Sequence, residues 1–219
     1  MPPKRRPPSV PSVAHSEHKR EEIISAAQTL FARKTFSGTS VREIARAARV
    51  NVASIYYYFG DKNGLQFAVL DRAYAGLHSA VEKSASISDP RERLKNLLDE
   101  TAAFLAKDPT THRIMVQAGF EGTPEIEKVI RVRLRKTRLL INQAIEEGIE
   151  LGVFRPVNVE VFSFGLMSAL MGFFSSRFLF VKLFAGNSPV TLFDQSLPFP
   201  IWEMTLRGLS LWNRDEKKG

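Results

Sequence analysis

The spacing of the apolar residues constrains the fold of this chain more than any other feature of its sequence. From residue 17 onward, apolar side chains recur at steps of three and four residues, the spacing that lines up one face of an α-helix. No segment shows the sustained alternation of apolar and polar residues that is typical of β-strands, and no internal repeat is present. The sequence therefore predicts an all-α fold, with about nine helices of ordinary length.

Three helices are expected in the first third of the chain, over residues 17–34, 40–48 and 51–59. Ser40 and Glu43 have the spacing of a capping box, in which the hydroxyl and the carboxylate each satisfy a free amide at a helix start. Asn51 is expected to cap the third helix, and Asp61 the longer helix that follows Gly60.

Residues 40–59 are thus predicted to form two short helices joined by a tight turn. This geometry places the second helix in the major groove of DNA, although other αα-hairpins share the pattern. Residues 1–72 carry 12 Lys and Arg against 6 Asp and Glu, whereas the rest of the chain carries 19 against 17. Such a local positive excess favours a polyanionic partner, with an anionic membrane surface or simple solubility as alternatives.

The residues of this region resemble the signature of the tetracycline-repressor (TetR) family. The segment "TSVREIARAARV", residues 39–50, is followed by "NVASIYYYFGDKNGL", residues 51–65. The family has a Thr/Ser-led second helix, a small-residue turn, a short recognition helix that ends in paired aromatics and Phe, and a lysine that opens the fourth helix. The resemblance implies a bacterial transcription regulator, most often a repressor, that binds a palindromic operator as a homodimer and responds to a small effector.

One position departs from the family pattern. The turn between the two short helices has Arg49 where the family usually has glycine. A left-handed backbone is expected there, which costs a residue other than glycine roughly 1 to 2 kcal/mol. A contact between Arg49 and a DNA phosphate is one way to offset that cost.

The residues expected to contact DNA are Ser40, Arg42, Asn51, Val52, Ala53, Ser54, Tyr56, Tyr57, Tyr58 and Lys62. The start of the recognition helix generally reaches the base edges, so Asn51 and Ser54 are expected to hydrogen-bond there. Val52 and Ala53 can offer only apolar contact, for instance with thymine methyl groups. The alternatives are core packing for Tyr56, and capping or solvent exposure for Ser40 and Arg42.

The downstream sequence predicts further helices from about Leu94 to Lys107, over residues 110–119 and 124–151, from Asn158 or Val159 to Ala185, and over residues 201–213. Thr123 and Pro124 form a typical helix start, and Gly152 a typical stop. The predicted domains are a flexible basic arm at residues 1–16, a helix-turn-helix domain at 17–63, and an effector-binding and dimerisation domain at 64–219. The arm is interpreted either as a solvated tail or as a further DNA contact.

The predicted helix after Val159 carries a stripe of small residues. Its segment 161–176 is uncharged but shorter than the roughly 20 residues that span a membrane, so a buried helix is expected. The resemblance implies a homodimer interface made by this helix and the last one: Gly165, Ser168, Ala169, Gly172, Ser176, Trp202, Leu206 and Leu209. The alternative is that these helices close the core of a monomer.

By the same resemblance, an effector is expected to bind among the fourth to seventh helices. The candidate lining residues are Tyr74, His78, Phe104, His112, Met115, Gln117, Phe120 and Phe162, each of which could instead be ordinary core. Because the chain holds 16 Phe, an apolar or aromatic effector is preferred.

Other functional classes find less support in the sequence. There is no cysteine, the four histidines lack metal-ligand spacing, and neither a Gly-rich phosphate loop nor a nucleophile elbow occurs. We therefore expect no enzyme activity, no cofactor and no metal. The N-terminus lacks the apolar run of a secretory signal, which favours the cytoplasm, and no membrane partner is expected. The alternative function is a helical interaction or membrane-surface adaptor.

Overall fold

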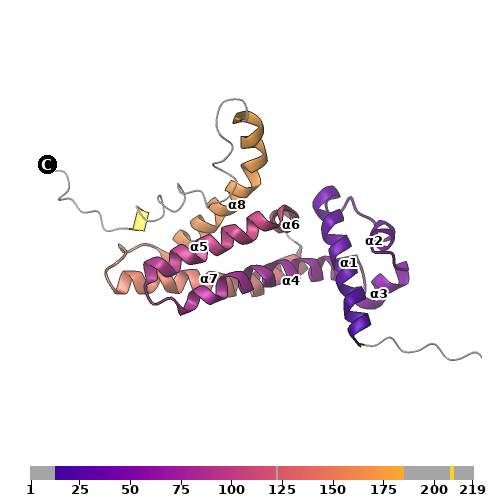
Figure 1. Ribbon diagram of the computed structural model, residues 1–219, viewed down its shortest axis with the longest axis horizontal. Helices are drawn as coiled ribbons and strands as arrows, with labels where there is room; N and C mark the ends of the chain where they lie inside the picture. Colours follow the sequence, from indigo (N-terminus) through magenta and orange to yellow (C-terminus); the bar gives the residue numbers. More distant parts are fainter. Residues whose placement is uncertain (1–12, 122, 185–207, 210–219) are drawn as a thin grey trace, which may run out of the picture. The chain divides into compact units, whose positions relative to one another are not determined.

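The computed structural model describes residues 13–121, 123–184 and 208–209 (Figure 1). These residues form eight α-helices and one 3-10 helix and contain no strand, which confirms the all-α fold. The chain divides into two compact units, Met1–Val69 and Leu70–Gly219.

The first unit contains α1 (Val13–Lys34), α2 (Val41–Ala47), α3 (Val52–Phe59) and the start of α4 (Lys62–Val81). In Figure 1 these helices lie in the indigo to purple part of the ribbon. The apolar stripe of α1 and the inner faces of α2 and α3 form one core, whose most deeply buried members are Ile23, Ile24, Ala27, Ile44, Ile55 and Leu65. Burying these side chains is what holds helices as short as α2 and α3, since isolated helices of this length are marginal in water.

Helix α1 begins at Val13, earlier than the start at Glu17 that the apolar pattern predicts. Residues 13–16 are therefore helical and do not belong to the flexible arm expected there. The apolar pattern misses this turn because its described side chains are polar or exposed, and Ser16 donates its hydroxyl hydrogen to the Tyr58 hydroxyl over 3.1 Å. Residues 1–12, which hold the rest of the predicted arm, lie outside the described part of the chain.

The predicted helix caps of the first unit are confirmed. Ser40 Oγ accepts from the Glu43 amide, while Glu43 Oε2 accepts from the Ser40 amide at 2.9 Å, which completes the capping box. Asn51 Oδ1 accepts from the Ala53 amide at 2.9 Å, and Asp61 Oδ1 from the Gly64 amide at 2.7 Å. These side chains satisfy amides that a helix start otherwise leaves free.

The Glu43 carboxylate leads to a prediction about pH. Hydrogen bonds from Lys34, at 2.5 Å, and from Ser40 lower the pKa of Glu43 from 4.5 to about 2. Because the folded state lowers this pKa, the stabilisation is present above pH 4.5 and is lost as the pH falls through about 2. We expect Glu43→Gln to destabilise the protein at neutral pH, and the gap between variant and wild type to close in that acid range. Urea unfolding of both proteins at several pH values measures this, and a gap that is independent of pH would contradict it.

The second unit is built from the remainder of α4 and from helices that follow it: the 3-10 helix η1 (Glu82–Ser86), α5 (Pro90–Lys107), α6 (Pro109–Glu121), α7 (Pro124–Glu150) and α8 (Val159–Phe184). Helix η1 was not predicted. The core of this unit is formed by the apolar stripes of α5 and α7 together with residues of α4 and α8: Leu77, Leu94, Leu97, Leu98, Leu105, Ile141, Ile145 and Leu170. The expected cap at Thr123 is confirmed, since its hydroxyl accepts from the Ile126 amide at 3.4 Å.

The connection between α7 and α8 is closed by Phe154. This side chain is 1% exposed and packs on Gly148, where an added Cβ would lie 2.1 Å from the ring. Gly152 takes a positive φ of 69° and ends the helix, as predicted. The Arg155 amide donates to the carbonyl of Leu209 at 2.7 Å, and Leu209 is fully buried. The rest of the final helix predicted at residues 201–213, with Trp202 and Leu206, lies outside the described residues.

Candidate DNA-binding and effector sites

Helix α3 presents most of its surface to solvent. Among its residues only Ile55 is fully buried, and this side chain fixes the helix against the core of the first unit. Asn51 and Ala53, at the helix start, are exposed, and the Tyr57 ring is 82% exposed. The exposed start of α3 also carries the positive end of the helix dipole, which favours a phosphate group.

The aromatic residues at the end of α3 differ in their surroundings. Tyr58 is half-buried, with its hydroxyl held by Ser16 and its ring packed edge-on against Tyr57 at 5.0 Å between centroids. The guanidinium of Arg20 lies 5.4 Å from the centre of the Phe59 ring. Tyr58 and Phe59 therefore contact α1 and hold α3 against it, whereas the Tyr57 ring remains exposed to solvent.

The other predicted DNA-contact residues occupy varied positions around the same surface. Tyr56 is 52% exposed, which disfavours the core alternative for its ring. Arg42 is exposed, whereas the Ser40 side chain is engaged in the capping box. Lys62 is half-buried, with its ammonium group 4.2 Å from the centre of the Phe36 ring. Val52 and Ser54 are also half-buried.

The turn between α2 and α3 has the left-handed residue that the sequence predicts. Arg49 has a φ of 54°, its amide donates to the Arg46 carbonyl, and the Val50 amide donates to the Ala45 carbonyl. This pair of bonds is the Schellman arrangement that commonly ends helices at a glycine. Thr35 has a similar φ of 66° at the end of α1, a strain that no sequence signal predicted.

Arg49 allows backbone strain and charge to be separated by two substitutions. Arg49→Gly is expected to raise the free energy of unfolding by about 0.5 to 1 kcal/mol, because glycine adopts a positive φ without strain but is more flexible when unfolded. Arg49→Ala keeps the strain, so its stability should match the wild type. If Arg49 contacts a phosphate, both variants lose the same DNA affinity. Denaturant unfolding measures the change in stability, and DNA titration measures the change in affinity. An Arg49→Gly protein less stable than Arg49→Ala would contradict the inference that the backbone at Arg49 is strained.

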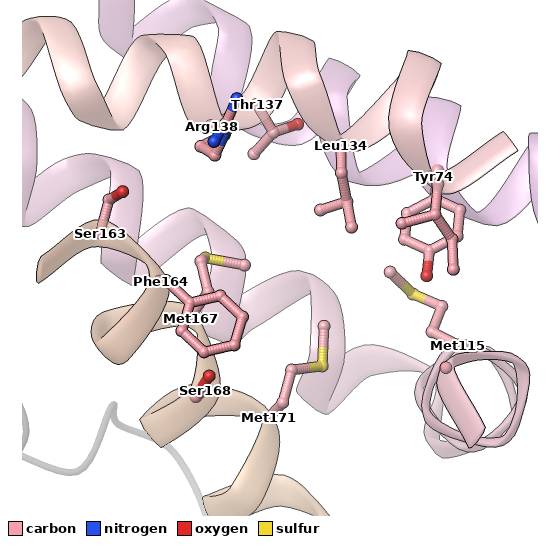
Figure 2. A pocket seen from close by; sticks show the side chains of 12 residues that line it. Tyr74, Met115, Leu134, Thr137, Arg138, Ser163, Phe164, Met167, Ser168 and Met171 are labelled. Atoms are coloured by element: carbon pink, nitrogen blue, oxygen red, sulfur yellow. The ribbon is translucent and has the colours of Figure 1, made fainter. Parts of the chain in front are cut away.

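A pocket of about 340 Å³ lies in the second unit, between α4, α6, α7 and α8 (Figure 2). It is lined by Tyr74, Met115, Gly119, Ile130, Leu134, Thr137, Arg138, Ser163, Phe164, Met167, Ser168 and Met171. Most of this wall is apolar, and the volume is in the range of pockets that hold small organic molecules. In Figure 2 the Tyr74 ring, the Leu134 side chain and the thioethers of Met115, Met167 and Met171 surround the open space.

Two of the eight residues predicted to contact an effector, Tyr74 and Met115, line this pocket. His112 is buried behind it, with Nε2 3.3 Å from the Met171 carbonyl, and burial lowers the pKa of this imidazole. Phe104 packs against Gly76, and His78 lies 3.9 Å from Glu82. The remaining three, Gln117, Phe120 and Phe162, are not on the pocket wall, and the Phe120 ring is 88% exposed.

Sequence reasoning missed most of the α7 and α8 wall. Leu134, Thr137 and Arg138 line the pocket from α7, and none of them was among the predicted effector contacts. Met167 and Met171 are four residues apart on α8, and this pair was the available signal, since flexible thioethers are common on adaptable binding surfaces.

Helix α8 is not buried all round, which corrects the expectation drawn from its composition. Val161 is 68% exposed and Phe164 72% exposed. Gly165, Ser168, Ala169 and Gly172, four members of the predicted small-residue stripe, are exposed or half-buried, as is Ser176. An added Cβ at Gly165 or Gly172 would meet no atom within 4 Å. The helix is apolar on all sides, but one face has no partner in the described residues.

The same helix is long and apolar enough to cross a membrane by length and composition. Only 17% of the window Val159–Ser176 is buried. Among the described residues this apolar face stays uncovered, and faces of this kind are typical of protein or membrane interaction sites.

The fold and the exposed α3 surface define a helix-turn-helix DNA-binding protein with a helical second unit. Residues 23–69 match the family model of bacterial regulatory proteins of the tetR family, and residues 88–175 match a tetracyclin repressor-like C-terminal domain. The chain belongs to the TetR family of transcriptional regulators.

Individual relatives agree with this assignment. A probable HTH-type transcriptional regulator, YttP of Bacillus subtilis, is 32% identical over 69% of this chain and 75% of its own length. The HTH-type transcriptional repressor NicS of Pseudomonas putida is 25% identical over 74% of this chain and 78% of its own. The crystal structure of PfmR, a TetR-family regulator of Thermus thermophilus, is 25% identical, with a TM-score of 0.68 over 86% of this chain and 99% of PfmR.

Proposed function

We propose that this protein is a ligand-responsive repressor that binds a palindromic operator as a homodimer and is released by a small apolar effector. It acts in the cytoplasm on double-stranded DNA, and it is a regulator and not an enzyme. The observation that carries the proposal is the exposure of Asn51, Ala53 and the Tyr57 ring on α3, a helix that Ile55 anchors to the core.

The DNA contacts follow from the chemistry of the exposed groups. Asn51 and Ala53 begin a helix whose positive dipole end favours phosphate and whose first turn suits the base edges. The Tyr57 hydroxyl stands on a rigid, exposed ring and is suited to a phosphate oxygen. Arg42 is exposed in the first turn of α2, where it can follow the backbone. These contacts position the protein, while the start of α3 reads the sequence.

The functional division of the chain follows the helices. We assign operator binding to the segment up to the start of α4, and effector binding and dimerisation to the helices after it. Helix α4 belongs to both, because its first residues lie in the first unit while Tyr74 lines the pocket in the second. In the second unit Asp71 accepts two hydrogen bonds from the Arg133 guanidinium of α7, one of them at 2.8 Å. An effector that displaces Tyr74 or the neighbouring Leu134 would act directly on this link between α4 and α7.

The homodimer accounts for the open face of α8. Small residues let a second helix approach closely, and two recognition helices in one assembly would read successive major grooves about 34 Å apart. Because the chain is a DNA-binding regulator by family, a second copy of α8 is a better partner for this face than lipid.

Fluorescence anisotropy with the DNA upstream of the protein's own gene tests the proposal. We expect sub-micromolar binding to one palindromic site that weakens steeply with added salt, since phosphate contacts release counterions. A scrambled duplex of the same length is the control. Equal affinity for both duplexes at moderate salt would refute sequence-specific repression.

A further inference from the structure

The pocket holds a polar group for which the described residues provide no hydrogen-bond partner. Tyr74 is 4% exposed, and its hydroxyl makes no hydrogen bond with any residue that the structure describes. Figure 2 shows this hydroxyl directed into the space beside Met115. Burial raises the pKa of Tyr74 to about 12, so the group is a neutral phenol. Because this hydroxyl faces the open space of the pocket, it can donate to an acceptor on a bound molecule.

The pocket wall also includes one cation, Arg138, beside the hydroxyl-bearing residues Thr137, Ser163 and Ser168. Arg138 lines the pocket from α7 and forms an ion pair with Glu160 of α8. The two side chains of this pair are 46% and 59% exposed, and an ion pair so open to water is weak. The Asn142 amide also donates to Glu160, at 3.1 Å, so Glu160 keeps a partner if Arg138 turns to another anion.

Further positive charge lies on the same side of α7. Arg131 and Arg135 precede Arg138 by seven and three residues, which places the three guanidinium groups on one flank of the helix. Both are exposed, and neither has an acidic partner among the residues described. The pocket therefore combines a largely apolar wall, the hydroxyls of Tyr74, Thr137, Ser163 and Ser168, and the cation Arg138. Arg131 and Arg135 lie on the same flank of α7, outside the wall.

We propose that the effector is an amphipathic organic acid. Its apolar body contacts Leu134 and the three methionines, its anionic group pairs with Arg138, and a hydrogen-bond acceptor elsewhere on the molecule accepts from the Tyr74 hydroxyl. This inference rests on the proposed function, because it names the chemical class that the regulator recognises. A neutral hydrocarbon would leave the Tyr74 hydroxyl and Arg138 unused, and a cation would be repelled by the flank of α7.

Calorimetric titration of the purified full-length protein with a matched probe set tests the proposal. Decanol offers an apolar chain without charge, decanoate adds the anion, and ω-hydroxydecanoate adds an acceptor at the far end. The series is repeated from octanoate to tetradecanoate, so that some member fits the distance between Tyr74 and Arg138. We expect affinity to rise from alcohol to acid by about tenfold, and from acid to the best-fitting hydroxy acid by roughly fivefold.

Two conservative variants test whether Tyr74 and Arg138 cause these increases in affinity. Tyr74→Phe should remove the gain of the hydroxy acid and leave the plain acid unchanged. Arg138→Gln should weaken both acids by about tenfold and leave the alcohol unchanged. Acids that bind no better than alcohols at any chain length, or gains that survive in the variants, would overturn the proposal.

Operator binding without any probe is measured in parallel. Wild type and both variants should bind DNA alike, since neither residue belongs to the DNA-binding surface. If the organic acids do not bind but the operator does, only the proposed effector class is rejected. If the wild type does not bind the operator, the proposed function as a repressor is rejected.

Discussion

Replacing Ala53 by Asp is expected to abolish operator binding while leaving the protein as stable as the wild type or slightly more stable. Ala53 is exposed in the first turn of α3, so the change disturbs no packing. A carboxylate at this position interacts favourably with the helix dipole, by about 0.3 to 1 kcal/mol. The same charge would face the phosphates and base edges of the duplex. Like-charge contacts cost several kcal/mol, so we expect at least a roughly 100-fold loss of affinity.

Ala53→Asn is the matched control for this charge, because asparagine has nearly the same shape as aspartate without the negative charge. It should change affinity much less than Ala53→Asp. Thermal unfolding and anisotropy titration of the three proteins separate folding from binding. If Ala53→Asp bound the operator as well as the wild type, α3 would not be the element that enters the groove.

Replacing Gly172 by Arg is expected to convert the protein into monomers and to lower operator affinity by about 100-fold or more, because two linked half-sites bind far better than one. Gly172 is exposed and has open space around it, so the protomer itself should still fold. A long cationic side chain there would block the close approach of a second α8. Sedimentation equilibrium gives the mass of the assembly at micromolar concentration, and DNA titration gives the affinity.

Ala106→Arg serves as the control, since it adds the same side chain at an exposed position of another helix, α5. That variant should remain dimeric. A dimeric Gly172→Arg protein would place the interface elsewhere. Binding of the wild type to lipid vesicles, lost in Gly172→Arg, would instead support the membrane alternative for α8.

Local chemistry made much of the first unit predictable from sequence. The capping box of Ser40 and Glu43, the cap at Asn51 and the left-handed Arg49 each depend on residues within a few positions along the chain. Such features are decided by steric limits and by hydrogen bonds that short segments satisfy alone. The positions of α2 and α3 were therefore recovered from residue types and spacing.

Features that depend on tertiary packing were less predictable. The start of α1 at Val13 is supported by the hydrogen bond from Ser16 to the distant Tyr58, and the spacing of apolar residues cannot predict that contact. The pocket wall requires knowing which faces of α7 and α8 meet, so Leu134 and Met171 could not be told apart from ordinary core. The open face of α8 was interpreted as buried because its residues are apolar. Apolar character alone does not show whether another element packs on a residue.

Selection of bound sequences from a random DNA pool by the wild-type protein tests the central claim most directly. Two copies of α3 held in one dimer should enrich an inverted repeat, with half-site centres one or two helical turns apart. Ala53→Asp, selected in parallel, should enrich nothing. An enriched single half-site, or a pool that stays random under conditions where the protein is folded, would contradict the account.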